Sequence, residues 1–230
     1  MAGGRGSRLG PYTTVLPKPL MPLGDRPILD VLLRQVVHAG AEHVSISVGH
    51  LGGIIESWVR AEDFGVPISF LYEGEPLGTA GALRNARAHE TFMAMNGDVL
   101  TTLSFRSLVE HHRASGAVAT MAVTERTTQV EYGVVQTDGA GMLSGLEEKP
   151  RLSYTVSMGV YVFEPRAADL IAHGERIDFP DLLERAMERG ERVSTYLHEG
   201  YWRDIGNPDD YQAAVADFAE DSGRFIGGRS

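Results

Sequence analysis

Short apolar, β-branched runs alternate with amphipathic helical patterns through the first half of this 230-residue chain. Parallel strands need a crossover between them, and a helix that makes the crossover lies on one face of the sheet. The alternation therefore predicts an α/β fold of three layers, with helices on both faces of a mixed, mostly parallel sheet. Asp25 is placed to cap the first helix, Pro27 fits its first turn and Gly40 can end it. The predicted strands are 43–48, 67–72, 92–96 and 118–124, and the predicted helices are 27–39, 53–59, 79–88 and 104–114.

The second half of the chain has a different pattern. Two extended runs, 132–137 and 142–148, flank an Asp-Gly-Ala-Gly segment that is typical of a hairpin turn. A third strand at 156–163 follows, and we expect these antiparallel strands to join one edge of the sheet. Without a long linker or an internal repeat, residues 1–221 are expected to form a single domain, and residues 222–230 a frayed tail. The remaining predicted elements are helices at 165–173, 179–189 and 208–219 and a strand at 192–198.

Composition and charge narrow the range of functions. The net charge is −10, from 21 basic and 31 acidic residues, which argues against a nucleic-acid surface because such a surface needs a basic stripe. The chain has no cysteine, which excludes disulfides, thiolate metal ligands and cysteine nucleophiles. No apolar run approaches the roughly 20 residues of a membrane span. The N-terminus also lacks the apolar core of a signal peptide. We therefore expect a cytoplasmic protein that binds neither nucleic acid nor membrane.

Gly3, Gly4 and Gly6 lie within four positions near the N-terminus, and Arg8 and Lys18 follow them. Closely spaced glycines let successive backbone N–H groups converge on an anion. Two cations would offset part of the charge of a triphosphate. The segment has neither the spacing of a P-loop nor that of a dinucleotide-binding fingerprint. The alternative is an N-terminal tail that is rich in Gly and Arg for no binding purpose.

Two acidic residues are candidate metal ligands. Asp98 follows Asn96 and Gly97 at the end of a predicted strand, where ligands bind in open α/β sheets, and a carboxylate there can hold Mg²⁺. The alternative for this segment is an ordinary turn. Asp204 lies in an aromatic, Gly-flanked turn and is a candidate second ligand; the alternatives are that it pairs with Arg203 or caps a turn.

Glu148 and Lys149 end another predicted strand. A carboxylate can accept hydrogen bonds from two sugar hydroxyls, and a neighbouring ammonium can bind a sugar phosphate. A solvated, charged strand end is the alternative. None of the eight histidines falls in these segments, and His111 and His112 are expected on the surface of a helix.

Together these segments resemble the sugar-1-phosphate nucleotidyltransferase family, in that family's order and spacing from Ala2 to about Tyr211. The chain is most similar to short bacterial mannose- and heptose-1-phosphate guanylyltransferases, and it also resembles glucose-1-phosphate thymidylyltransferases. The resemblance implies a Rossmann-like nucleotide-diphospho-sugar transferase fold. The implied reaction is magnesium-dependent transfer of a nucleoside monophosphate from a nucleoside triphosphate, with GTP favoured, to a hexose or heptose 1-phosphate. The sequence leaves open whether the chain forms a homo-oligomer. The matching stretches are AGGRGSRLGPYTTVLPKPL, GDRPIL, EGEPLGTAGAL, MNGDVL, YGVV, EEKP, MGVYVF and YWRDIGNPDDY.

The resemblance also implies individual roles. Asp98 and Asp204 would bind Mg²⁺, while Lys18 would contact the phosphate under attack. The implied catalytic residues are Arg8, Lys18, Asp98, Lys149 and Asp204. The implied nucleotide-binding residues are Gly3, Gly4, Gly6, Ser7, Leu77, Gly78, Thr79, Gly81 and Asn96. The implied sugar-phosphate-binding residues are Gly133, Glu148, Lys149 and Ser157.

Two features depart from the family. Relatives have an apolar strand before the AGG segment, and this chain has Met1 in its place, so we expect a costly groove at the centre of the sheet. Ser157 stands where many relatives have Asn near the sugar. The alternative function is a non-catalytic homologue that binds a nucleotide sugar and regulates a partner, and the missing strand is the best argument for it. A glycosyltransferase is disfavoured because the chain has no DxD motif.

Overall fold

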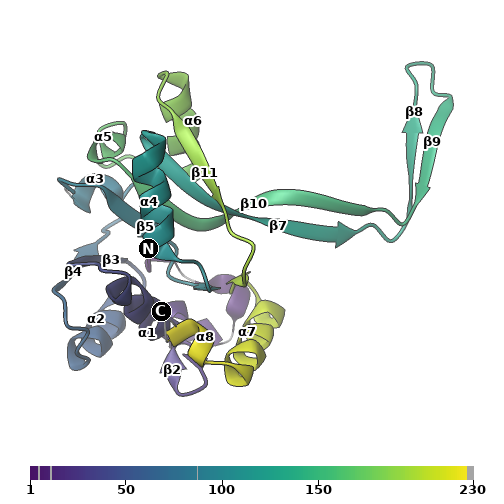
Figure 1. Ribbon diagram of the computed structural model, residues 1–230. Helices are drawn as coiled ribbons and strands as arrows, with labels where there is room; N and C mark the ends of the chain where they lie inside the picture. Colours follow the sequence, from purple (N-terminus) through teal and green to yellow (C-terminus); the bar gives the residue numbers. More distant parts are fainter. Residues whose placement is uncertain (5, 11, 87, 227–230) are drawn as a thin grey trace.

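The structure, a computed structural model, describes residues 1–4, 6–10, 12–86 and 88–226 (Figure 1). Its body is a mixed β-sheet with helices on both faces, and a long two-stranded arm extends from that body (Figure 1). Within the described residues, no helix has both the length and the apolar composition needed to cross a membrane.

Six strands make the sheet, in two hydrogen-bonded portions. The first portion is a parallel pair, β3 (Val44–Val48) and β4 (Ile68–Tyr72). The second has the order β11–β7–β10–β5, comprising β11 (Val193–Leu197), β7 (Ala119–Gln129), β10 (Arg151–Phe163) and β5 (Phe92–Met95). The α-helices are α1 (Ile28–His38), α2 (Gly52–Ala61), α3 (Leu83–Ala86), α4 (Phe105–Ser115), α5 (Pro165–Ala168), α6 (Phe179–Glu188), α7 (Pro208–Glu220) and α8 (Gly223–Ile226). The short elements are η1 (Ser7–Leu9), η2 (Tyr12–Thr14), η3 (Lys18–Leu20), β1 (Pro22–Leu23), β2 (Arg26–Pro27), β6 (Val99–Thr101) and β12 (Trp202–Asp204).

The first two residues of the chain join the two portions of the sheet. The Met1 amino group donates to the Met95 carbonyl and the Gly97 N–H donates to the Met1 carbonyl, both at 2.8 Å, which is a parallel pattern. On the other side, the Ala2 N–H donates to the Ser47 carbonyl at 2.8 Å. Met1 and Ala2 therefore occupy the central position where a groove was expected, and their hydrogen bonds to both neighbouring strands correct that expectation at these two residues. The resulting order is β4–β3–(1–2)–β5–β10–β7–β11, and among these strands only β10 runs against the others.

The position of β10 corrects the expectation that the antiparallel strands join one edge of the sheet. β10 pairs with β5 on one side and with β7 on the other, so it lies inside the sheet. Its second half, 158–163, is buried throughout, and an apolar run without alternation needs cover on both faces. The hairpin strands β8 (Gly133–Thr137) and β9 (Leu143–Glu148) pair with each other and not with the sheet.

Alternate side chains of β10 face two helical layers. Tyr161 and Phe163 pack with α5 and α6, where the Tyr161 and Phe179 rings stack with centroids 4.3 Å apart. Val160 and Val162 pack with α1 and α4 on the opposite face. The body therefore has the three layers that the sequence predicts.

Several element ends differ from the sequence-based expectations. Asp25 does not cap α1, because Pro27 occupies the N-cap position and makes no side-chain cap. The helices expected at 79–88 and 165–173 shrink to α3 and α5. Part of the expected frayed tail is the helix α8, whose Phe225 is buried and stacks on Phe218 with ring centroids 5.8 Å apart. Residues 227–230 lie outside the described part of the chain.

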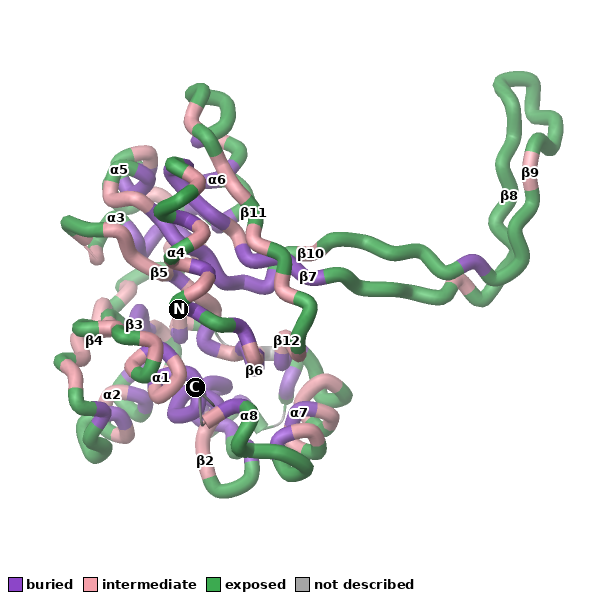
Figure 2. The backbone as a smooth tube through the Cα atoms, in the orientation of Figure 1, coloured by how far each residue is buried: buried purple, intermediate pink, exposed green. Residues whose placement is uncertain are grey.

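The arm consists of residues 124–156, that is, the outer part of the β7–β10 ladder together with the β8–β9 hairpin. The ladder pairs continuously from Arg151 with Gln129 to Ser157 with Val123, and its register shifts between Ser157 and Tyr161. Figure 2 shows that the arm is exposed along almost its whole length and that its hairpin lies far from the body.

Candidate functional site

The glycine-rich segment forms a loop at the carboxyl ends of β3 and β5. Gly6 adopts a left-handed conformation, with φ of 59°, that favours glycine. Its carbonyl accepts hydrogen bonds from Thr13 Oγ1 and from the Leu9 N–H, both at 2.9 Å. Leu9 is fully buried, whereas Gly4 is exposed. The core beneath the loop therefore fixes the backbone around Gly6 and leaves Gly4 open to a ligand.

Lys18 and Asp98 form an ion pair beside this loop. Lys18 Nζ donates to Asp98 Oδ2, and the two side chains are only 10% and 24% exposed. Asp98 Oδ1 is buried and has no hydrogen-bond partner among the described residues. Because a buried acceptor without a donor costs free energy, this oxygen is poised to bind a ligand.

Asp204 lies next to Asp98 because β12 pairs with β6. The pairing places Asp204 opposite Val99, and the Ile205 N–H donates to the Asp98 carbonyl at 3.0 Å. Burial raises the pKa of Asp204 above its usual 3.8, and the negative charge of Asp98 raises it further, while Lys18 and Arg8 oppose the shift. The two carboxylates are therefore close enough to repel each other.

These elements enclose one cavity of about 270 Å³. A Cβ placed on Gly206 would lie 3.0 Å from Asp204 Oδ2 and 3.6 Å from Arg8 Nη1, so the acid and the base flank this glycine. Exposed backbone and two cations suit an anion, and the carboxylates suit a metal ion. The lining includes Gly4, Gly6, Arg8, Lys18, Asp98 and Gly206.

The donor set fits Mg²⁺. Asp98 offers one carboxylate oxygen without a partner, and Asp204 offers a second carboxylate beside it. Mg²⁺ in nucleotide enzymes is usually held by one or two carboxylates together with substrate phosphates and water. The described residues contain no group of three or more His, Asp or Glu that could form a complete protein cage. The remaining ligands would therefore come from substrate and solvent.

The loop 77–81 is held against the start of α6. Gly78 has φ of 78°, and a Cβ there would lie 2.5 Å from the Ile177 carbonyl oxygen, so this position requires glycine. The Thr79 N–H and Oγ1 donate to Asp178 Oδ1 at 2.7 and 3.0 Å. Thr79 Oγ1 also accepts from the Phe179 N–H at 2.9 Å. The polar groups of Thr79 therefore bond within the protein, and these bonds fix the position of the half-buried loop relative to α6.

Glu73 connects this loop with the glycine-rich loop. Its Oε2 accepts from the Leu77 N–H at 3.1 Å, and its Oε1 accepts from Ser47 Oγ. A Cβ on Gly3 would lie 3.6 Å from the same Oε1. Gly81, the last residue of the 77–81 loop, is buried. Glu73 was not predicted to have a role; the signal that could have found it is an acid shortly before the predicted base-binding loop.

Two further predicted residues, Asn96 and Ser157, do not line the 270 Å³ cavity. Asn96 packs against Gly159, whose carbonyl accepts from the Asn96 N–H at 2.9 Å. Ser157 Oγ shares a hydrogen bond of 2.9 Å with the Tyr161 hydroxyl. The Ser7 backbone lies in η1, and its side chain falls outside what the structure describes. Their assigned roles stay predictions.

Gly133, Glu148 and Lys149 lie on the arm, away from the cavity (Figure 1). Gly133 and Glu148 are partners in the β8–β9 pairing, and both are exposed. Lys149 has φ of 48°, which is unusual for a residue with a side chain, and its N–H donates to the Tyr132 carbonyl at 3.3 Å. Within this chain, the predicted sugar-phosphate residues and the predicted nucleotide residues are therefore not brought together.

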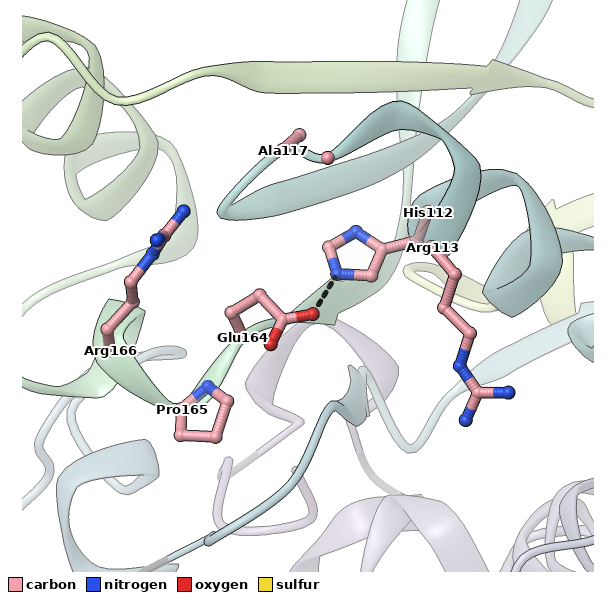
Figure 3. A pocket seen from close by; sticks show the side chains of 7 residues that line it. His112, Arg113, Ala117, Glu164, Pro165 and Arg166 are labelled. Carbon is pink, nitrogen blue, oxygen red and sulfur yellow. Dashed lines mark hydrogen bonds and ion pairs between the residues drawn. The ribbon is translucent and has the colours of Figure 1, made fainter.

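A second cavity, of about 390 Å³, lies between the end of α4 and the start of α5 (Figure 3). His112 is 1% exposed, which corrects the expectation of a surface position, because it lies on the side of α4 that packs on the sheet. Its Nε2 donates to Glu164 at 3.1 Å and its Nδ1 bonds to Thr120 Oγ1 at 2.8 Å. Burial lowers the pKa of His112 below 6.5, although Glu164 opposes the shift. Buried and bonded on both nitrogens, His112 has a structural role.

Four residues that line the 270 Å³ cavity were not predicted as site residues: Met1, Ala2, Pro19 and Gly206. Pro19 and Gly206 stand beside predicted residues, and that proximity is the signal that could have found them. Met1 and Ala2 reach the cavity only because they complete the sheet.

Comparisons with known proteins agree with the fold. Residues 1–221 match the family model described as "Nucleotidyl transferase". The UTP–glucose-1-phosphate uridylyltransferase of Synechocystis sp. is 33% identical over 94% of this chain and 61% of its own length. The mannose-1-phosphate guanylyltransferase catalytic subunit beta of Danio rerio is 33% identical over 92% of this chain and 61% of its own length.

The chain thus spans about three fifths of the length of these curated relatives. The crystal structure of HddC from Yersinia pseudotuberculosis aligns with a TM-score of 0.72 at 25% identity, over 94% of this chain and 96% of that one. The family model covers nearly the whole described chain, and its relatives are sugar-1-phosphate nucleotidyltransferases that differ in their nucleotide. The chain belongs to the nucleotidyl transferase family, as its motifs predict.

Proposed function

We propose that the chain transfers a nucleoside monophosphate from a nucleoside triphosphate to a hexose or heptose 1-phosphate and releases pyrophosphate. The observation that carries the proposal is the cavity that joins the glycine-rich loop and Lys18 to a carboxylate with one unpartnered oxygen. GTP is the favoured donor because the motifs are most similar to those of guanylyltransferases. Relatives named for UTP and for guanylyl transfer support the reaction class and differ in the base.

The reaction needs no general base. An oxygen of the sugar phosphate, already an anion at neutral pH, attacks the α-phosphorus in line. The new bond forms between that oxygen and the α-phosphorus, while the bond to the bridging oxygen of the β-phosphate breaks and pyrophosphate leaves with the electron pair. Catalysis of this kind depends on alignment and on stabilising charge.

Arg8 and Lys18 supply positive charge where two anions meet. Lys18 is held by Asp98 and is one of the residues that line the cavity, so it would contact the α-phosphate. Arg8 lies beside Gly206 on the same cavity and would contact the leaving phosphates. The backbone of Gly4 and Gly6 would hold the triphosphate, and the 77–81 loop would read the base.

Asp98 and Asp204 would hold Mg²⁺, which supplies charge neutralisation and orients the phosphates when bound. Their proximity and the unpartnered Asp98 oxygen support this assignment. On the acceptor side, Glu148 would bind sugar hydroxyls and Lys149 the sugar phosphate, with the Gly133 backbone and Ser157 near the sugar.

The test is pyrophosphate release with Mg²⁺ across GTP, UTP, CTP, dTTP and ATP, each combined with glucose, mannose and heptose 1-phosphates. Release that requires both substrates, greatest with GTP, is expected. Greatest release with another triphosphate would overturn the guanine preference and leave the reaction class intact. Tight nucleotide-sugar binding by calorimetry, with no release from any pair, would favour the non-catalytic regulator instead.

A further inference from the structure

The arm exposes apolar side chains to an extent that the rest of the described chain does not. Eight of the fourteen exposed large hydrophobic residues in the described part of the chain lie on it, including Tyr132 at 78%, Leu146 at 66% and Val135 at 59%. Two-stranded ribbons are marginally stable without a third strand or a packed face. The two unpaired edges of this ribbon can also hydrogen-bond to another chain. The arm therefore needs a covering surface.

The arm also carries Glu148 and Lys149, the two residues proposed to bind the sugar phosphate. The cavity contains groups for phosphates and a metal ion, and the arm contributes none of its lining. Lys149, at the junction of the ribbon and the hairpin, holds a strained backbone conformation with φ of 48°. Such strain in a residue with a side chain is often retained at binding sites.

The ladder directs the arm away from its own cavity. Its pairing is unbroken over seven residue pairs, from Arg151 with Gln129 to Ser157 with Val123. Figures 1 and 2 show that the β8–β9 hairpin lies beyond the far end of this ladder and packs on no element of the body. To reach its own cavity, the arm would have to fold back at its base and lose part of this ladder. Reaching the cavity of a second copy leaves the ladder intact.

The body offers an apolar surface beside the cavity. Tyr12 is 57% exposed and Val15 is 76% exposed, and both lie on the segment between Gly6 and Lys18, which line the cavity. An arm of 33 residues slightly exceeds the 20–30 residues per side of a stable protein interface. Reciprocal exchange uses the same two surfaces twice and closes with twofold symmetry.

We propose that two copies of this chain exchange arms, so that the hairpin of each copy lies over the cavity of the other and contributes Glu148 and Lys149 to the acceptor site. The proposal rests on the proposed function for the roles of these two residues. A complete active site then contains Lys18 and Asp98 from one copy and Lys149 from the other.

Removing the arm tests the assembly without any assay of activity. Thr124 and Val156 are backbone partners, so Asn-Gly in place of residues 125–155 closes the ladder with a two-residue turn. In analytical ultracentrifugation, the wild-type chain is expected as a dimer and the armless chain as a monomer. Circular dichroism and a melting curve check that the armless body remains folded. A monomeric wild-type chain, or an armless chain that still dimerises, overturns the proposal.

Cross-linking identifies which cavity each arm reaches, and the lack of native cysteine makes it specific. A Tyr12→Cys chain and a Leu146→Cys chain, mixed and treated with a short bismaleimide, are expected to give a two-chain product that contains one of each. The double variant is diluted and treated as a comparison, because closure within one chain would give a cross-linked single chain. A single-chain product as the main species overturns the proposal, whether or not the wild-type chain shows turnover.

Complementation then tests the contribution to the site. Asp98→Asn impairs the cavity and Lys149→Ala impairs the arm, so each variant alone is expected to be nearly inactive. In a co-expressed mixture, half of the pairs are mixed and each has one intact site, so about a quarter of wild-type turnover should return. An active wild-type chain with no recovery in the mixture overturns the exchange and leaves the proposed function standing. An inactive wild-type chain counts against the proposed function, and the cross-link still decides the exchange.

Discussion

At the scale of single residues, Asp98 is the centre of the site. One of its oxygens accepts from Lys18, and the other has no partner among the described residues. Its charge also raises the pKa of Asp204, after the larger effect of burial, while Lys18 and Arg8 only partly oppose the shift. A cation bound by both carboxylates would offset their repulsion. The ligand-free protein therefore holds its acids in an arrangement that binding improves.

We expect Asp98→Asn to lower turnover strongly while it leaves the stability of the fold nearly unchanged. The amide keeps the shape and can still accept from Lys18, but it loses the charge that a metal ion needs. Turnover should fall roughly a hundredfold, which corresponds to a loss of about 3 kcal/mol of transition-state stabilisation. The free energy of unfolding should change by less than about 1 kcal/mol, because repulsion with Asp204 is relieved as the ion pair weakens. Pyrophosphate release and urea denaturation measure the two quantities.

The exposed Asp25 provides the matched control. Asp25→Asn makes the same chemical change outside the cavity and should leave turnover at the wild-type level. Turnover by Asp98→Asn within a few fold of wild type would refute the metal assignment.

The residue types of this site were predictable, and part of its wall was not. Lys18, Asp98 and Asp204 were found from the sequence because cations and acids next to glycines or strand ends suit phosphates and metals. Gly206 was missed as a cavity wall, because it reaches Arg8 only through the pairing of β12 with β6, about 100 residues apart. No local pattern encodes that pairing.

At the scale of elements, the 77–81 loop and α6 form one unit. Asp178 is the N-cap of α6 within a capping box, and it also accepts from the N–H and the hydroxyl of Thr79. This explains why the expected helix at 79–88 is reduced to α3. The backbone groups of Leu77 and Ala80 bond to Ile177 instead of forming a helical turn. Helical pattern alone could not show that a segment 100 residues away would take these bonds.

A double-mutant cycle should detect this unit. Thr79→Val is expected to cost about 1 kcal/mol of unfolding free energy and Asp178→Ala about 1–2 kcal/mol. Because each change removes the same shared hydrogen bond, the double variant should cost about 1 kcal/mol less than the two single costs together. Urea denaturation of the four chains gives the coupling.

Ser104 provides the comparison, since it caps α4 rather than α6. Thr79→Val combined with Ser104→Ala should be additive within about 0.5 kcal/mol. An equally additive pair at Thr79 and Asp178 would show that the loop and α6 are energetically independent.

At the scale of the whole molecule, the stability should depend on pH through a buried histidine. Burial lowers the pKa of His112 below 6.5, despite the opposing effect of Glu164 and with further lowering by His111 and Arg113. The unfolded chain takes up a proton near pH 6.5, so unfolding becomes easier as the pH falls below that value. Above about pH 6.5 this contribution is fully present. The slope cannot exceed about 1.4 kcal/mol per pH unit for one proton.

His112→Gln should flatten this slope below pH 6.5 while lowering stability at every pH, because it removes the imidazole bonds to Thr120 and Glu164. The exposed His89→Gln is the control and should keep the wild-type slope. Some slope should remain in His112→Gln, since burial also lowers the pKa of His198. Melting temperatures from pH 5 to 8 make the comparison, and an unchanged slope in His112→Gln would contradict it.

The layered body follows from the sequence more readily than its connections do. Alternating strands and helices predicted three layers, because each apolar strand needs cover. The interior position of β10 was missed, since its buried half and its exposed half form one continuous strand of 13 residues. Because the pattern of apolar and polar residues changes within one strand, it does not show where the sheet ends and the arm begins.

The cavity is built from both ends of the chain, and this has a consequence for ligand binding. The loop with Gly4 and Lys18 meets Asp98 and the turn at Gly206, so a triphosphate with Mg²⁺ would add contacts between segments that are far apart in the sequence. A donor triphosphate at a hundred times its Kd should raise the free energy of unfolding by about 2.7 kcal/mol, roughly 5–10 °C for a chain of this size. The rise should shrink when EDTA replaces Mg²⁺, and Asp98→Asn should lose this metal-dependent part whereas Asp25→Asn keeps it. Thermal shift measurements with each triphosphate make the test. Equal shifts with and without Mg²⁺ would mean that the carboxylates at Asp98 and Asp204 do not hold a metal ion for the nucleotide.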